Sequence, residues 1–133
     1  MLFDTHTHAQ FNAFKDDSQE VIKRALAESV GMILVGTQKD TSAAAIELAE
    51  KFDGPVYAAV GLHPIHTIGG EEESASEGSE LSFKPRQEEF DASYYRELIK
   101  SSKRVVAIGE CGLDYYRIKP DDAADGLAIA FCC

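Results

Sequence analysis

Short, uninterrupted apolar runs separated by helix-like segments are the feature that most limits the folds open to this sequence. The runs MILVGT (32–37), VYAAVGL (56–62) and RVVAIGE (104–110) have the length of strands, and the unbroken apolar character of MILVGT is typical of a strand covered on both faces. The run LFDTH (2–6) predicts a first, shorter strand. Because helix-like segments connect these strands, we expect parallel βαβ units with right-handed crossovers.

Amphipathic spacing predicts three helices between the strands. The segments concerned are 16–31, 41–52 and 93–102. Asp17 or Ser18 can cap the first helix and Gly31 can end it, and Asp40 or Thr41 can cap the second. The sequence therefore predicts an α/β fold of repeated strand and helix units.

Two segments depart from this regular pattern within what we expect to be a single domain, residues 1–133. Residues 68–90 are rich in glutamate, serine and glycine with little periodicity, which predicts an exposed, mobile acidic insertion. The tail, residues 118–133, resembles neither a regular helix nor a strand and is interpreted as divergent or truncated.

Composition excludes several classes of protein. No apolar run approaches the roughly eighteen residues that a membrane helix needs, and the first residues lack the pattern of a signal peptide, so we expect no membrane association and a cytoplasmic location. Three cysteines without a signal favour reduced thiols. A net charge of −10 argues against broad electrostatic binding of nucleic acid, although a bound divalent cation would invert the field locally.

Parallel units of this kind belong either to a doubly wound sheet or to part of a (β/α)8 barrel. A doubly wound dinucleotide-binding fold would place a glycine-rich phosphate loop after the first strand, where this sequence has histidines instead. The barrel is therefore the better interpretation.

Unusual polar residues lie where the predicted strands end. His6 and His8 close the first strand, His63 follows the third and Glu110 ends the fourth. Because the carboxyl ends of parallel strands meet on one face, we expect these side chains to converge there. Neutral imidazole suits zinc, manganese, iron or nickel, and a carboxylate can bind one ion or bridge two. The pattern thus predicts a hydrolytic metal site.

Each of these residues also has a simpler interpretation. The two histidines can be ordinary sequence, His63 can cap a turn before Pro64, and Glu110 can point to solvent. His66, in the loop that follows, is expected to be solvated. Arg117 can meet a phosphate or be a surface charge.

Three stretches resemble the N-terminal motifs of the TatD family of metal-dependent deoxyribonucleases, which are amidohydrolase-like (β/α)8 barrels. They are FDTHTHAQF (3–11), AVGLHP (59–64) and AIGECGLDYYR (107–117), in the same order and on the same strands as in the family. The resemblance covers residues 1 to about 117 and implies that the chain corresponds to the N-terminal half of such a barrel.

The resemblance also implies a site and a reaction. His6 and His8 would hold one divalent ion and Glu110 would bridge to a second, with magnesium, manganese or zinc as the metal. Glu110 and His63 would act in catalysis, His63 by contacting the substrate phosphate. The implied reaction is hydrolysis of a phosphodiester at a DNA end by a metal-activated water.

The family's second half would supply two further histidine ligands and an aspartate, and no residue of this sequence matches them. We therefore expect the activity to be impaired. Two alternatives stay open: a non-catalytic fragment that binds metal or a partner, and a metal-dependent hydrolase of another ester or amide. The sequence leaves the oligomeric state undetermined.

Overall fold

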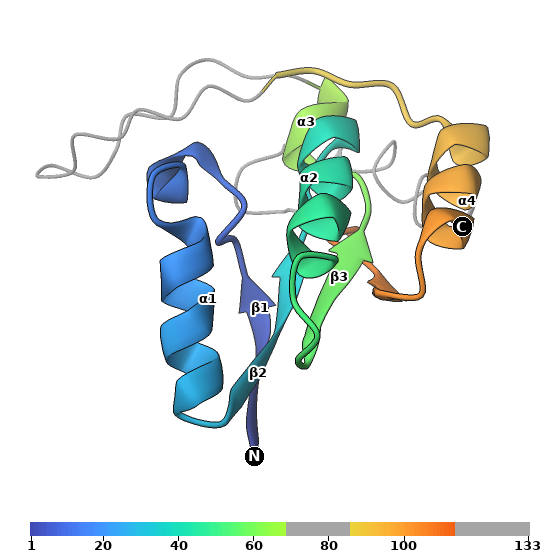
Figure 1. Ribbon diagram of the computed structural model, residues 1–133. Coiled ribbons are helices and arrows are strands. Elements are labelled where there is room, and N and C mark those ends of the chain that lie inside the picture. Colours follow the sequence, from blue (N-terminus) through green and yellow to red (C-terminus); the bar gives the residue numbers. More distant parts are fainter. Residues whose placement is uncertain (69–85, 114–133) are drawn as a thin grey trace, which may run out of the picture.

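The computed structural model describes residues 1–68 and 86–113 and contains one parallel sheet (Figure 1). Its strands lie in the order β1-β2-β3-β4. Their bounds are Leu2–Thr7 for β1, Val30–Val35 for β2, Val56–Val60 for β3 and Val105–Ile108 for β4. All three neighbouring pairs are parallel. Within the described residues the strand order follows the chain without a reversal, which is the arrangement of a barrel and differs from a doubly wound sheet, where the order reverses at a switch point.

Helices connect the strands as the spacing predicts. They are η1, a 3-10 turn (Asn12–Phe14), α1 (Ser18–Ala27), α2 (Lys39–Ala49), the single turn α3 (Ile65–Ile68) and α4 (Ala92–Ser101). Helix α1 contacts β2, α2 contacts β2 and β3, and α4 contacts β3 and α2. Helices α1, α2 and α4 thus each pack on a strand that they join, as right-handed βαβ units require.

The core lies between the central strands and the helices. Alternate residues of β2 and β3, such as Leu34 and Val60, are buried in one cluster with Ile22 of α1 and Ala45 of α2. Successive strand residues face opposite sides of a sheet, so the residues between them form the other face. The central strands are therefore the part of the sheet that the helices cover.

The first helix ends earlier than predicted. It stops at Ala27, four residues before Gly31, and Ser29 takes the left-handed conformation with a φ of 60°. Gly31 instead pairs with Phe3 inside the sheet, where an added Cβ would lie 2.7 Å from the Phe3 ring. The prediction of Gly31 as the helix stop is wrong because the glycine serves close packing of β1 on β2.

The predicted caps of the second helix are also wrong. Helix α2 begins at Lys39, and its cap is Gln38, whose backbone N–H donates to the Thr41 hydroxyl over 2.9 Å. Thr41 thus satisfies the helix start from the third helical position. Asp40 instead accepts a hydrogen bond from Arg86 over 2.7 Å.

The end of the predicted insertion, residues 86–90, hydrogen-bonds to the start of α2 and to the α3 turn. Residues 69–85 lie outside the described residues, and the mobility of the insertion stays a prediction. The predicted tail, 118–133, and Arg117 also lie outside the described residues. In the part of the chain that the structure describes, no helix has both the length and the apolar character to cross a membrane.

Candidate metal centre

The four side chains predicted from the strand ends come together at one edge of the sheet. His6 lies in the last part of β1 and His8 follows it, His63 follows β3, and Glu110 follows β4. The Glu110 carboxylate is their meeting point. Its Oε1 lies 2.7 Å from His6 Nε2 and 3.3 Å from His8 Nε2, and its Oε2 lies 3.2 Å from His63 Nε2.

Three of these residues have the geometry of metal ligands. One ligand atom from each of His6, His8 and Glu110 lies within 4.8 Å of the others. Metal-to-ligand distances of about 2.0–2.2 Å would hold such atoms within about 4.4 Å of one another, so binding of one ion would need only a small inward shift of these side chains. His6 is 56% exposed at its side chain, so the cluster is open to solvent on that side. The donor set of two imidazoles and a carboxylate fits zinc or manganese.

Backbone contacts hold the end of β4 against its neighbours. The Glu110 N–H donates to the Gly36 carbonyl over 3.0 Å, and the Gly109 N–H donates to the Val60 carbonyl over 2.9 Å. At Gly61 an added Cβ would meet the Glu110 carbonyl oxygen and the Gly109 carbonyl carbon, both at 2.8 Å. Gly61 is therefore required for Glu110 to approach β3 this closely.

The Val35 carbonyl and the Phe11 ring fix the orientation of the His8 ring. Its Nδ1 lies 2.8 Å from the Val35 carbonyl oxygen, which can only accept, so Nδ1 carries a proton. Nε2 lies 3.3 Å from Glu110 Oε1: it donates to the carboxylate when the ring is charged and offers a lone pair to a metal ion when the ring is neutral. Phe11 stacks on the ring with centroids 4.5 Å apart. Gln10 donates to the same Val35 carbonyl over 2.7 Å. A backbone carbonyl behind a histidine is a common support for a metal ligand.

His63 has the opposite tautomer. The Ile65 N–H donates to His63 Nδ1 over 3.1 Å, so the proton of the neutral ring is on Nε2, the atom that faces Glu110. The His63 N–H donates to the Thr37 carbonyl over 2.9 Å. His63 Nδ1 thus accepts a backbone hydrogen bond in the turn around Pro64, and Nε2 faces the Glu110 carboxylate. A contact of His63 with substrate stays a prediction.

The charges in the cluster reinforce one another. Hydrogen bonds from His63 and His8 hold the pKa of Glu110 well below its usual value, although partial burial opposes this. The hydrogen bond to Glu110 in turn raises the pKa of His8. Glu110 is therefore a carboxylate at neutral pH, and the interpretation that it simply points to solvent does not hold.

His66 is buried, so the prediction that it is solvated is wrong. Only 2% of the residue is exposed, and its Nδ1 hydrogen-bonds to the Arg86 carbonyl over 3.1 Å. Burial and the neighbouring His63 lower the pKa of His66 to about 4. Sequence reasoning missed this histidine because a single helical turn has no periodicity to mark its buried side.

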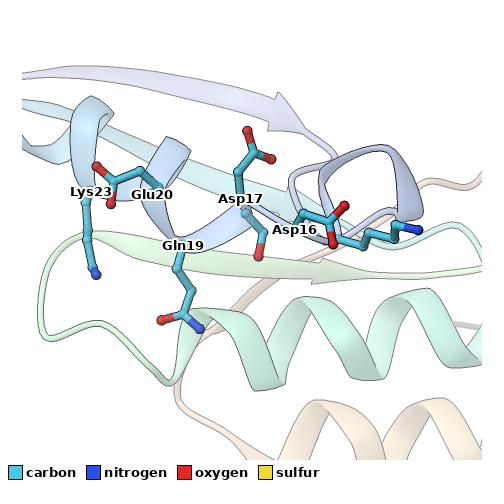
Figure 2. Close-up of a pocket in the computed structure, with 7 residues that line it drawn as sticks. Asp16, Asp17, Gln19, Glu20 and Lys23 are labelled. Carbon is cyan, nitrogen blue, oxygen red and sulfur yellow. The ribbon is translucent and has the colours of Figure 1, made fainter.

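A surface pocket of about 210 Å³ lies elsewhere, at the start of α1 (Figure 2). Its lining is polar and of mixed charge: Lys15, Asp16, Asp17, Ser18, Gln19, Glu20 and Lys23. None of the four clustered residues contributes to it. The candidate site is therefore the group around Glu110 and not this pocket.

A parallel β/α sheet with histidines and a carboxylate gathered at its carboxyl edge is typical of metal-dependent hydrolases built on (β/α)8 barrels. Within that class, the chain belongs to the TatD family, because the family model described as TatD related DNase matches residues 3–126.

Similar proteins agree with the family. The protein named uncharacterized metal-dependent hydrolase YabD, from Bacillus subtilis, is 38% identical over 117 residues, which are 87% of this chain and 38% of that protein. The protein named 3'-5' ssDNA/RNA exonuclease TatD, from Pantoea vagans, is 35% identical over 117 residues, with the same coverage. The chain thus spans about two fifths of the length of these curated relatives.

A solved structure confirms the predicted fold class. The crystal structure of YjjV, a TatD homologue from Escherichia coli, superposes with a TM-score of 0.68 and 26% identity. The match covers 98% of this chain and 44% of the other. The strands and helices described above correspond to part of a TatD-type (β/α)8 barrel.

Proposed function

We propose that His6, His8 and Glu110 bind a divalent metal ion in an active site that hydrolyses phosphodiester bonds at the ends of nucleic acids. The observation that carries this proposal is the convergence of three histidines on one ionised carboxylate at the carboxyl edge of the sheet. Family membership supports the same reaction class.

Contacts within the protein set the protonation of the proposed ligands His8 and Glu110. In its neutral form His8 would present an Nε2 lone pair to the ion, because the Val35 carbonyl holds the ring proton on Nδ1. Glu110 supplies negative charge, and it keeps that charge at neutral pH because its pKa is lowered. Divalent ions bound there would activate water and neutralise charge on a phosphate.

His63 contributes a hydrogen-bond donor. In the absence of substrate its Nε2 proton is directed to Glu110 Oε2 at 3.2 Å. We propose that a non-bridging phosphate oxygen accepts this proton's hydrogen bond when substrate binds, so that His63 orients the phosphate and does not ligate the metal. A role of Glu110 as bridge to a second ion is part of the same proposal.

The substrate class follows from the relatives. Several are named 3'-5' ssDNA/RNA exonuclease, which supports a single-stranded DNA or RNA end as the substrate here. A net charge of −10 gives no long-range attraction to a polyanion, so binding must depend on the local site. A cytoplasmic location stays a prediction.

The described residues hold one group of three potential metal ligands, and a two-ion site needs more. We therefore propose that the 133-residue chain by itself binds metal but turns over substrate poorly. The remaining ligands would have to come from outside the residues that the structure describes.

The first experiment is elemental analysis of the purified chain beside its His6→Ala/His8→Ala variant and His63→Gln. We expect about one ion per chain in the wild type and in His63→Gln, and loss of that ion in the double variant. Equal metal content in all three proteins would contradict the proposed ligands.

A second measurement addresses the reaction. Shortening of a labelled single-stranded oligonucleotide with added manganese should be slow, and it should vanish in Glu110→Ala. Metal binding without any such activity would favour the alternative of a non-catalytic metal-binding fragment. Manganese-dependent hydrolysis of a simple ester or amide, with the oligonucleotide left intact, would favour a different substrate for the same site.

A further inference from the structure

The segment that precedes α4 is joined to the turn that carries His63. We call residues 86–90 the strap; Figure 1 shows it running past the ends of α2 and α3 to α4. Its Glu88 N–H donates to the His66 carbonyl over 2.8 Å. The Arg86 carbonyl accepts from the Gln38 side chain over 2.9 Å and is 3.1 Å from His66 Nδ1. The strap thus joins the start of α2 to α3.

The carboxylate of Glu88 is the centre of this connection. It accepts from the Lys39 N–H at the start of α2, with both oxygens at 3.2–3.3 Å. It also lies 3.1 Å from the hydroxyl of Tyr95, a buried residue of α4. The same hydroxyl lies 3.2 Å from the Gly61 carbonyl at the end of β3. These two acceptors share the one hydroxyl proton of Tyr95. The half-buried Glu88 carboxylate therefore links α2 to α4 beside the end of β3.

These contacts surround the turn that sets the His63 tautomer. The His66 N–H donates to the His63 carbonyl over 3.0 Å, and the Ile65 N–H donates to His63 Nδ1 over 3.1 Å. The strap holds His66 by its backbone carbonyl and by its ring nitrogen. If that hold is lost, the Ile65 N–H is free to leave Nδ1, and the ring can then take either tautomer.

We propose that Glu88 is a positioning residue for His63: by fixing the turn 63–66 through the strap, it keeps the proton of His63 on Nε2, where Glu110 and a substrate oxygen can accept it. The role toward substrate rests on the proposed function above. The effect on the His63 tautomer does not depend on it.

The charge of Glu88 suits its position. A carboxylate at the start of a helix meets unpaired N–H groups and the positive end of the helix dipole, which favours the contact with Lys39. Burial and the nearby Glu88 carboxylate raise the pKa of Tyr95, so its hydroxyl stays protonated and can donate to Glu88. Glu89, the next residue, is exposed and offers a matched control of equal charge.

The test compares Glu88→Ala, Glu88→Gln and Glu89→Ala with the wild type. Nitrogen-15 spectra of the histidine rings report which ring nitrogen of His63 carries the proton, and elemental analysis reports bound metal. We expect one His63 tautomer in the wild type and in Glu89→Ala, and a mixture of tautomers in Glu88→Ala. Glu88→Gln keeps one acceptor oxygen and is expected to give an intermediate mixture.

Metal binding separates positioning of His63 from a general disturbance of the site. We expect the metal affinity of Glu88→Ala to fall less than the 10-fold to 100-fold that is typical when direct support of a ligand is removed. A single unchanged His63 tautomer in both Glu88 variants would overturn the proposal, as would an equal change in Glu89→Ala. If Glu88→Ala does not fold, Glu88→Gln and Glu89→Ala decide the question.

The outcome is independent of nuclease activity. Loss of the tautomer in Glu88→Ala supports the proposal even if no nucleic acid is hydrolysed, and that combination would overturn only the proposed function. Hydrolysis of nucleic acid together with an unchanged His63 tautomer in the Glu88 variants would support the proposed function and overturn the role of Glu88.

Discussion

The central and the edge strands of the sheet differ in what they contribute. Strands β2 and β3 are mostly buried, and they form the core with α1, α2 and α4. Most residues of β1 and β4 are exposed, yet His6 and Glu110 lie in or just after these edge strands. Stability is thus concentrated in the centre of the sheet and the candidate chemistry at its edges. This separation predicts that the two properties respond to different substitutions.

The largest expected loss of stability follows substitution of a buried residue in the central strands. Leu34 is fully buried in β2, so Leu34→Ala should lower the free energy of unfolding by about 3–4 kcal/mol through lost burial and a cavity. Val106 of β4 is 51% exposed, and Val106→Ala should change the free energy by about 0.5 kcal/mol or less. Urea titrations followed by circular dichroism measure both. Equal losses at the two positions would remove the contrast between centre and edge.

The next effect is the loss of stability in acid that His66 causes. Its pKa is lowered to about 4 in the folded protein, so below the usual value of 6.5 the unfolded chain binds more protons. Stability should therefore fall as the pH drops from about 6.5 to about 4, by about 3 kcal/mol in total. The measurement is a series of urea titrations across this range for the wild type and His66→Gln.

Glu110 and Asp40 also have lowered pKa values, so their protonation destabilises the protein in acid as well. Only the difference between the wild type and His66→Gln is therefore assigned to His66. The variant should have a shallower dependence on pH over this interval. Parallel curves would show that His66 does not titrate as its burial implies.

The smallest of the three effects on stability is expected for Gly61→Ala, at the point where the end of the central strand β3 meets Glu110 after the edge strand β4. Gly61→Ala places a Cβ 2.8 Å from the Glu110 carbonyl oxygen, and such overpacking costs about 1–3 kcal/mol. The substitution should also move Glu110 away from its histidines and weaken metal binding, which calorimetric titration with zinc would measure. Gly109→Ala is the control, because an added Cβ there meets no atom within 4 Å. Unchanged zinc affinity in Gly61→Ala would mean that the site tolerates the shift.

The sequence was informative where regular spacing or a polar residue at a strand end carries the signal. The four strands, the parallel connection and the convergence of His6, His8, His63 and Glu110 all follow from such local patterns. The use of the four residues as ligands and hydrogen-bond donor stays a prediction.

Features that depend on distant contacts could not be predicted. Glu88 reaches the Lys39 N–H across 49 residues, and nothing in the acidic run around Glu88 distinguishes it from Glu89. His66 is buried because the strap covers a single helical turn, which carries no period of its own. The end of α1 was misplaced because Gly31 was needed for contact with Phe3 in the sheet.

The consecutive order of the strands also has a consequence for how the molecule assembles. Each strand pairs with the one before it, so the sheet can grow strand by strand as the chain leaves the ribosome. His6 emerges early, but its partner Glu110 follows 104 residues later. His6 and His8 are therefore synthesised three strands before Glu110, and a metal ion that needs all three of the proposed ligands could bind only after β4 has joined the sheet.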